Sequence, residues 1–314
     1  MIRIGFLACA DTLPGDGPRR GDAFEHDLEV AALRPAFENA GLELHEIDWR
    51  APLEDFDGIA LILLGTAWDY QDHPDAFLAK LEALAARGIQ VCNPPEVVRW
   101  NVDKRYLKEL EKNGATSVPT LWRTDIDRAG IEAAMEHFDT DRVVVKRQVG
   151  AGGLGQYSFS RDDLPDEGWS MGRACMVQPF LPSIVDEGEY TFVFVDGAFS
   201  HGVLKRAGEG EYRIQSLYGG YECDYAPDPQ DLARAEAVVA ALPFADLLYC
   251  RIDMARLPSG DLAVMEAEAI EPYLYPQQGP GLGQRLAQAI AARLADRAVA
   301  AAPSPSTRAA LRQP

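Results

Sequence analysis

The order of hydrophobic and polar positions in the first hundred residues alternates between strand-like and helix-like segments. Four short apolar runs predict strands, at Ile2–Ala8, Leu42–Asp48, 58–64 and 89–93. Between them, 23–40 and 74–87 carry apolar residues at the helical repeat and stop at Gly41 and Gly88, residues suited to end a helix. This alternation predicts a small parallel α/β layer.

The pattern breaks at Pro94 and Pro95, which cannot continue a strand. A helix over 104–110 is predicted next, with Asn101 or Asp103 as its cap.

From about Val118 the chain predicts paired strands with tight turns. Asp196–Gly197, the strongest type of hairpin signal, joins 190–195 to Ala198–Arg206. A second hairpin joins 250–257 to 262–270 through Pro258 to Asp261. A helix over 282–300 follows, and the Pro/Ser-rich end, 301–314, is predicted to be flexible.

Composition and charge narrow the class of protein. The 314 residues are 47% hydrophobic and 25% charged, as in ordinary globular proteins, and the length suggests about two domains. A formal net charge of −19 argues against a nucleic-acid partner, because phosphate contacts need clustered Lys and Arg. Five scattered cysteines and five histidines show no metal-ligand spacing, so free thiols and no zinc are expected. The chain begins directly with a short strand, and no apolar run approaches the roughly 20 residues that cross a bilayer, so a cytoplasmic protein is expected.

A glycine run after a strand is the first candidate for chemistry, and its sequence is VVVKRQVGAGGLGQYSF from Val143 to Phe159. It matches GxGxxG formally, but a strand pattern follows where the dinucleotide fingerprint needs a helix. A Walker loop has its lysine after the glycines, whereas Lys146 precedes them. Local order fits a strand–glycine turn–strand flap that closes over phosphates. The plain alternative is a flexible surface hairpin with an exposed lysine.

An acidic hairpin is the second candidate. A two-residue turn at Ser259–Gly260 would place Asp253 opposite Glu266 and Arg251 opposite Glu268. Opposed like charges destabilise a sheet unless they face water or hold a cation, and Mg²⁺ prefers a few carboxylates plus substrate phosphates. A solvated acidic face is the alternative, but the intervening residues are apolar. Together, the flap and the carboxylates predict a Mg–ATP site.

With these two features the chain resembles the ATP-grasp superfamily of carboxylate–amine ligases, in particular the glutathione-synthetase and RimK-like branch, which includes the cyclo-ligases of D-cycloserine biosynthesis. The resemblance covers roughly 93–300 and rests on eight motifs in order: WDY, NPPEVVRWNVDKRYLKEL, VVVKRQVGAGGLG, VQPFLP, EGEYTFVFVDGAFSHGVLKR, YRIQSLYGG, RIDM and MEAEAIEPYLYP.

The resemblance implies an α/β (α+β) fold of two domains. Residues 1–98 would form the pre-ATP-grasp α/β domain with a parallel sheet, and 99–300 the ATP-grasp domain. The latter would divide into an α+β lid subdomain at about 117–179 and an antiparallel-sheet subdomain at about 180–300, followed by the tail.

The resemblance also implies residue roles. ATP would be bound by Lys104, Lys146, Gly152, Gly153, Gly155, Gln178, Phe180, Leu181 and Glu189. Arg251, Arg213 and Lys205 would be catalytic. Asp253, Glu266 and Glu268 would hold Mg²⁺, as two ions, with Mn²⁺ as an alternative.

One departure concerns the metal strand. Most members have Glu-x-Asn there, whereas this chain has Glu266 and Glu268, which adds a negative charge. Glu271, Tyr273 and Tyr275 fall where other members contact substrate, although both tyrosines also suit wall packing. Trp68 is expected to pack at the domain junction, with Asp69 or Tyr70 touching substrate as the alternative.

The implied reaction converts a carboxylate to an acyl phosphate with release of ADP, and an amine then displaces phosphate to form an amide. Amino-acid or small-peptide-like substrates are expected, with intramolecular cyclisation as one version. A small-molecule kinase and a non-catalytic ATP-binding protein are the alternatives. Neither nucleic acid nor membrane is an expected partner, and because relatives are often dimers or tetramers a homo-oligomer stays an open alternative.

Overall fold

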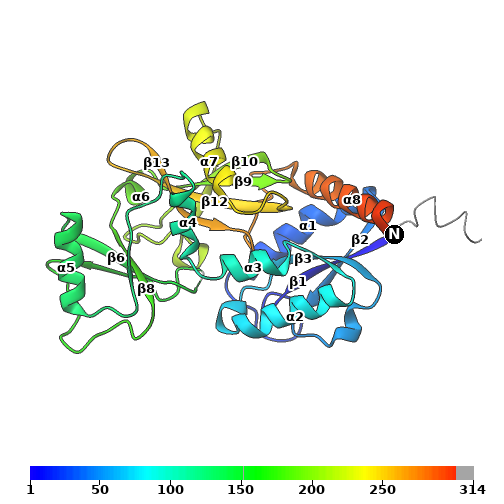
Figure 1. The fold of residues 1–314 in the computed structure, drawn as a ribbon, viewed down its shortest axis with the longest axis horizontal. Coiled ribbons are helices and arrows are strands. Elements are labelled where there is room, and N and C mark those ends of the chain that lie inside the picture. The colour runs from blue at the N-terminus through cyan, green and yellow to red at the C-terminus, as the bar shows by residue number, and fades with distance from the viewer. Residues whose placement is uncertain (151, 302–314) are drawn as a thin grey trace, which may run out of the picture.

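The computed structural model describes residues 1–150 and 152–301. Figure 1 shows these residues as three sheets in a row, with the lid sheet at one end, a central sheet, and the N-terminal sheet at the other end. The strand orders are β5-β8-β6-β7 in the lid, β11-β10-β9-β12-β13 in the centre and β2-β1-β3-β4 in the N-terminal sheet.

The N-terminal sheet is parallel throughout. Its strands are β1 (Ile2–Ala8), β2 (Leu42–Asp48), β3 (Ile59–Thr66) and β4 (Gln90–Cys92). The helices are α1 (Ala23–Asn39) and α2 (Pro74–Ala86), with single 3₁₀ turns η1 (Leu53–Phe56) and η2 (Tyr70–Asp72). Because parallel strands end at the same edge of a sheet, the loops after β1 and β3 leave side by side.

The lid sheet is antiparallel and is covered on one face by a helix. Its strands are β5 (Leu121–Arg123), β6 (Arg142–Arg147), β7 (Tyr157–Ser160) and β8 (Cys175–Pro179), and the helix is α5 (Arg128–Phe138). Ile131 and Met135 of α5 pack against Val143 and Val145 of β6.

The central sheet is also antiparallel. Its strands are β9 (Glu189–Val195), β10 (Ala198–Arg206), β11 (Tyr221–Tyr225), β12 (Tyr249–Arg256) and β13 (Leu262–Glu268). The predicted turn Asp196–Gly197 joins β9 to β10, and both residues have positive φ, +52° and +74°, as a type I′ turn requires.

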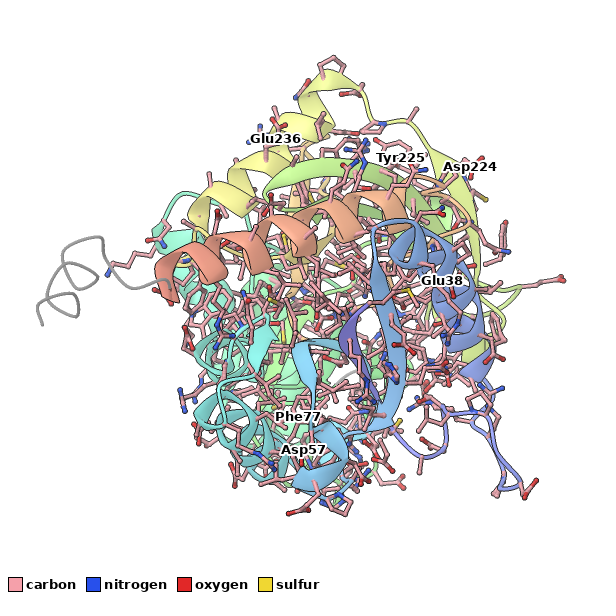
Figure 2. All side chains as sticks on the ribbon, turned by 90° about the vertical axis from the view of Figure 1, so that its right-hand side faces the viewer. Glu38, Asp57, Phe77, Asp224, Tyr225 and Glu236 are labelled. Carbon is pink, nitrogen blue, oxygen red and sulfur yellow. The ribbon has the colours of Figure 1, made fainter. Side chains whose placement is uncertain are left out.

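Successive side chains of β9 point to opposite faces of the central sheet. Phe192 and Phe194 pack with α4 (Tyr106–Lys112) and α7 (Pro229–Ala241). Val193 and Val195 pack on the other face with α1 and α8 (Leu282–Ala301). Figure 2 shows α8 running between the part that carries Tyr225 and Glu236 and the part that carries Phe77 and Asp57.

The face shared by α1 and α8 changes character along the strands. Beyond Val193, the next residues of β9 on that face are Thr191 and Glu189, and both are buried polar side chains. The same face of the sheet is therefore apolar at one end and charged at the other.

Two asparagines join the N-terminal layer to the central sheet. Asn93 Nδ2 donates to Tyr249 O and Ala269 O at 2.9 and 2.8 Å, and Asn93 Oδ1 accepts from Leu248 N–H at 2.8 Å. Asn101 makes a similar pair of bonds to the backbone of Ala267 and Ala269.

Several helices differ from the prediction. Pro95 starts a helix, α3 (Pro95–Asn101), because proline suits the first helical position. The helix expected over 104–110 is α4, Tyr106–Lys112. Neither predicted residue caps it: the N-cap position is Arg105, without a side-chain cap. The Asn101 amide binds β13, and Asp103 accepts from Arg105 N–H just before the helix. Four elements within the region expected to be strands were missed: α5, α7, the short α6 (Ser183–Asp186) and the turn η3 (Ser216–Tyr218).

The domain limits proposed from the sequence stay predictions. Ala301 is the last residue of α8, and the rest of the expected tail, 302–314, lies outside the described residues. Within the described chain, no helix is long and apolar enough to span a membrane, and all five cysteines are free thiols.

Candidate active site

A cavity of about 210 Å³ is lined by residues of the N-terminal layer, the lid and the central sheet. The loops after β1 and β3 contribute Arg20, Asp22 and Trp68 to its wall, and the first turn of α1 contributes Glu25. The lid contributes Lys146 and the glycine loop, here defined as residues 150 and 152–155, of which 150 and 152–154 line the wall. The central sheet contributes the charged end of its inner face.

Nearly every residue singled out from the sequence lines this cavity. These are Lys104, Lys146, Gly152, Gly153, Gln178, Phe180, Leu181, Glu189, Lys205, Arg213, Arg251, Asp253, Glu266, Glu268, Glu271, Tyr273 and Tyr275. Gly155 is not part of the lining, because its Cα faces the side chain of Arg147. Trp68 lines the cavity, whereas Asp69 and Tyr70 do not, and Asp69 instead binds Trp49 Nε1 and Arg50.

The centre of the cavity wall is a network of buried charges on β9, β10 and β12. Lys205 forms ion pairs with its cross-strand neighbour Glu189 and with Asp253, at 3.1 Å for the latter. Asp253 also accepts from Arg251 at 2.9 Å and from Thr191 Oγ1 at 2.6 Å. Burial alone would raise the pKa of Asp253, but Arg251 and Lys205 outweigh it and lower this pKa to about 2. Asp253 is therefore ionised at neutral pH.

Glu266 and Glu268 on β13 complete this network. Lys104 Nζ lies 2.8 Å from Glu266 Oε1 and also donates to Gly150 O, so it connects β13 with the glycine loop. Glu268 pairs with Arg251. Burial raises the pKa of Glu268 to about 7, against the attraction of Arg251 and with added repulsion from Glu266 and Asp253.

The register between β12 and β13 places Asp253 opposite Glu266 and Arg251 opposite Glu268. The expected two-residue turn is wrong, because Leu257 N–H donates to Asp261 O and Ala255 pairs with Ala263, which makes the loop one residue longer. That longer loop alone would put Met265 opposite Asp253. A bulge between Val264 and Glu266 absorbs the extra residue and restores the pairing.

The carboxylates of Asp253, Glu266 and Glu268 are the type of ligand that a divalent cation binds, but they are too far apart to enclose one by themselves. Oxygen ligands beside a phosphate-binding surface are what Mg²⁺ favours. Within the described chain, the one group of three ligand atoms all within 4.8 Å of one another is Cys9, Asp11 and Asp69, so Asp253, Glu266 and Glu268 are more widely spaced. A cation held by them would need further ligands, such as phosphate oxygens.

One end of the cavity is an apolar slot between the lid and the central sheet. Val144 and Met176 of the lid face Met265 across it, with Leu181 and Ile184 at the side. The Phe180 ring stacks beneath Arg142, whose Cζ lies 3.8 Å from the ring centroid. A flat aromatic base fits such a slot.

The opposite end is built by the N-terminal layer and was not predicted from the sequence. Arg20 pairs with Asp22 and lies 5.1 Å above the Trp68 ring, and Trp68 Nε1 donates to Glu271 O at 3.0 Å. Glu25 accepts from Ser216 Oγ at 2.6 Å, and burial raises its pKa to about 7. Tyr273 and Tyr275 pack edge to face at 4.7 Å and close the floor.

Comparison with known proteins identifies the fold. A family model for the N-terminal domain of D-cycloserine synthetase DcsG matches residues 4–93. The chain is 26% identical over 287 residues to the cycloserine biosynthesis protein DcsG of Streptomyces lavendulae, and the match covers 85% of this chain and 94% of that protein.

Solved structures show the same architecture. The crystal structure of D-cycloserine synthetase DcsG matches with a TM-score of 0.77 at 24% identity, covering 93% of this chain and 99% of that chain. D-alanine–D-alanine ligase from Bacillus anthracis matches with a TM-score of 0.64 at 16% identity, over 95% and 99%. The ATP-grasp ligase PsnB matches with a TM-score of 0.63 at 18% identity, over 92% and 98%. The predicted resemblance and the predicted fold class are confirmed, and the relatives are enzymes of the predicted kind, ligases.

Proposed function

We propose that this chain, which has the ATP-grasp fold and is homologous to a ligase, is an ATP-dependent, ADP-forming enzyme that joins a carboxylate to an amine. The observation that carries the proposal is the convergence of the glycine loop with Lys146 and the carboxylates of Asp253, Glu266 and Glu268 on one cavity. A nucleoside triphosphate fits between these groups. Its phosphates would contact the glycine loop and Lys146 on one side, and would reach the carboxylates through a bound cation on the other.

The adenine of ATP would occupy the apolar slot beside Phe180 and Leu181. The triphosphate would then extend toward Lys146, Lys104 and Lys205. Lys146 lines the cavity, and its ammonium group forms no ion pair among the described residues. Burial lowers the pKa of Lys146, so a nearby phosphate would stabilise its charged form. Glu189 and Gln178 complete the proposed nucleotide site, with Gly152, Gly153 and Gly155 as its flap.

Asp253, Glu266 and Glu268 would hold Mg²⁺, proposed as two ions, with Mn²⁺ as an alternative. Relatives of this fold have been solved with Mg and ADP or with ATP. When bound, the metal would neutralise phosphate charge, as in other phosphoryl-transfer sites. Glu268 would contribute a full negative charge where most members carry an amide.

The proposed reaction has two displacements. A carboxylate oxygen of the substrate attacks the γ-phosphorus, the bond from that phosphorus to the bridging oxygen breaks, and ADP leaves. The amine nitrogen then attacks the acyl carbon, inorganic phosphate leaves with the carbon–oxygen bond electrons, and the nitrogen loses a proton. Arg251, supported by Arg213 and Lys205, would stabilise the charge on oxygen in both steps. Closure of the glycine loop would exclude water from the acyl phosphate.

The substrate end favours a molecule that carries an amine. Eight acidic residues line the cavity, and five of them have a basic partner. Within the described residues, Glu25, Glu222 and Glu271 form no ion pair. Burial raises the pKa of each, which an ammonium ion would offset. Small amino-acid-like substrates therefore fit, with Tyr273 and Tyr275 as the floor.

Intramolecular cyclisation is the version that we propose to test first. The family match at residues 4–93 covers Arg20, Glu25 and Trp68, which form the substrate end. Similarity within this stretch therefore supports a substrate of the kind that a cycloserine-forming protein uses.

The test is a coupled assay for ADP and free phosphate with Mg–ATP and a panel of amino acids, including β-substituted ones that could close a five-membered ring. Asp253→Asn should abolish ADP release, while Asp261→Asn, at the tip of the same hairpin, should retain it. A stable phosphorylated product without free phosphate would indicate the kinase alternative instead. ATP binding without turnover on any substrate would indicate the non-catalytic alternative.

A further inference from the structure

Seven lysines and arginines line the cavity, and five of them are already neutralised. Arg20, Lys104, Lys205, Arg213 and Arg251 each form an ion pair with a neighbouring carboxylate. Lys146 and Arg147, two consecutive residues at the end of β6, have no such partner among the described residues. Lys146 already has a proposed role at the phosphates, whereas Arg147 has none.

Arg147 is unusual because its side chain has no polar partner of any kind in the described chain. Its guanidinium forms no hydrogen bond, ion pair or ring contact there, and the Nε atom is fully buried without an acceptor. A buried donor left unpaired costs about 1–3 kcal/mol, and buried polar groups in native proteins nearly always find a partner. Arg147 as a whole is only half-buried, so an acceptor that reached its guanidinium would offset this cost.

The position of the side chain shows where that acceptor comes from. The Arg147 side chain passes beneath the glycine loop, because a Cβ atom built on Gly155 would lie 2.2 Å from Arg147 Nε and 2.8 Å from Cζ. At the other end of the loop, a Cβ atom on Gly150 would lie 3.4 Å from Arg147 Cδ. Both ends of the loop therefore lie against this side chain, and a side chain at residue 155 would have to displace the guanidinium as well as adopt a φ of +69°.

We propose that Arg147 is a second phosphate-binding residue at the base of the glycine loop, and that its contact with the terminal phosphates of ATP holds the loop over the nucleotide. Arg147 is among the residues that line the cavity, so a ligand in the cavity is a source of an acceptor for its guanidinium. A guanidinium presents planar paired donors that match phosphate oxygens in a bidentate arrangement, which lysine cannot do. This inference rests on the proposed function in that the anion is a nucleoside triphosphate.

A purely structural role for Arg147 would rest on packing of its aliphatic stem against the glycines. Two substitutions distinguish the roles. Arg147→Met keeps the stem and removes the charge, and Arg147→Lys keeps the charge but not the planar donors. Arg123→Met is the matched control, because Arg123 is an exposed arginine on β5 of the same sheet and does not line the cavity.

The experiment is calorimetric titration of the full chain with Mg–ATP and, separately, with adenosine, after thermal melting has shown that each variant is folded. Loss of a charge-assisted contact predicts that Arg147→Met binds Mg–ATP about 10- to 100-fold more weakly, with adenosine affinity unchanged. Arg147→Lys should lie between, and Arg123→Met should match the wild type. Inorganic tripolyphosphate should displace Mg–ATP from the wild type but should displace it much less from Arg147→Met.

The outcomes separate this inference from the proposed function. If Arg147→Met binds Mg–ATP as tightly as the wild type, Arg147 does not contact phosphate, although the ligase proposal stands. If Arg147→Met loses affinity for adenosine and for Mg–ATP by the same factor, the role of Arg147 is structural. The role is also structural if Arg147→Met fails to fold while Arg147→Lys binds Mg–ATP as the wild type does. If the wild type itself binds no Mg–ATP, both proposals fall.

Discussion

Glu29 is a buried acid whose titration should be visible in the stability of the whole protein. It lies on α1, is 2% exposed, and its Oε2 atom has no hydrogen-bond partner in the described chain. Burial, with a smaller contribution from Glu25, raises the pKa of Glu29 from 4.5 to about 8. We therefore expect Glu29→Gln to change the pH dependence of unfolding.

The sign follows from proton linkage. Between the unfolded pKa of 4.5 and the folded pKa of about 8, the folded chain keeps a proton that the unfolded chain has lost. Stability therefore falls as pH rises through this window, and the full penalty is present above the folded pKa. At about 1.4 kcal/mol for each unit of pKa, the penalty is roughly 3 to 5 kcal/mol.

Urea denaturation of the wild type and Glu29→Gln at about pH 5 and about pH 8.5 measures this penalty on the free energy of unfolding. These pH values lie near the unfolded and folded pKa values of Glu29. Glu29→Gln should be close to wild type at the lower pH and several kcal/mol more stable at the higher one. The matched control is Glu38→Gln, which removes an exposed glutamate on the same helix, labelled in Figure 2. A Glu29→Gln difference that is the same at both pH values would refute the reasoning.

Three further predictions concern the site and its supports. Gly155→Ala should weaken Mg–ATP binding at least about 10-fold. In a double-mutant cycle, Gly155→Ala should cost less Mg–ATP affinity when residue 147 is already alanine, because the new methyl group then no longer clashes with Arg147 Nε. Asn93→Ala should lower the free energy of unfolding by about 3 kcal/mol, since it removes three buried hydrogen bonds; equal melting temperatures would contradict this. Glu25→Gln should raise KM for the amine-bearing substrate about 10-fold with KM for ATP unchanged, as steady-state kinetics can show.

Much of the fold follows from local patterns. The apolar runs of the N-terminal layer, the Asp196–Gly197 hairpin and the glycine run each depend on a few adjacent residues, so the sequence is sufficient to place them. Pro95 was misleading because a proline that excludes a strand also favours the first turn of a helix. The helices α5 and α7 lie between strands of antiparallel sheets, where an expectation of hairpins obscured their helical repeat.

The acidic hairpin shows a limit of such reasoning. The pairing of Asp253 with Glu266 was predicted correctly from a turn that the structure does not contain, because a longer loop and the bulge at Met265 shift the register in opposite directions. A bulge depends on packing between sheets, which no local pattern reveals. Arg20 and Glu25 were missed for a related reason: the loop after β1 and the start of α1 reach the cavity only because parallel strands end at one edge of the sheet.

The inner face of the central sheet changes from charged to apolar within two residues of β9, and Tyr273 and Tyr275 stand at that border, in contact with both the cavity and the core. The depth of the cavity at this end is thus set by two aromatic rings rather than by the glycine loop. Trimming Tyr273 would lengthen the chamber toward α1, whereas the Tyr275 ring also lies 5.7 Å from Lys205 Nζ and 5.5 Å from Arg251 Cζ, so trimming that ring would alter the charged network as well.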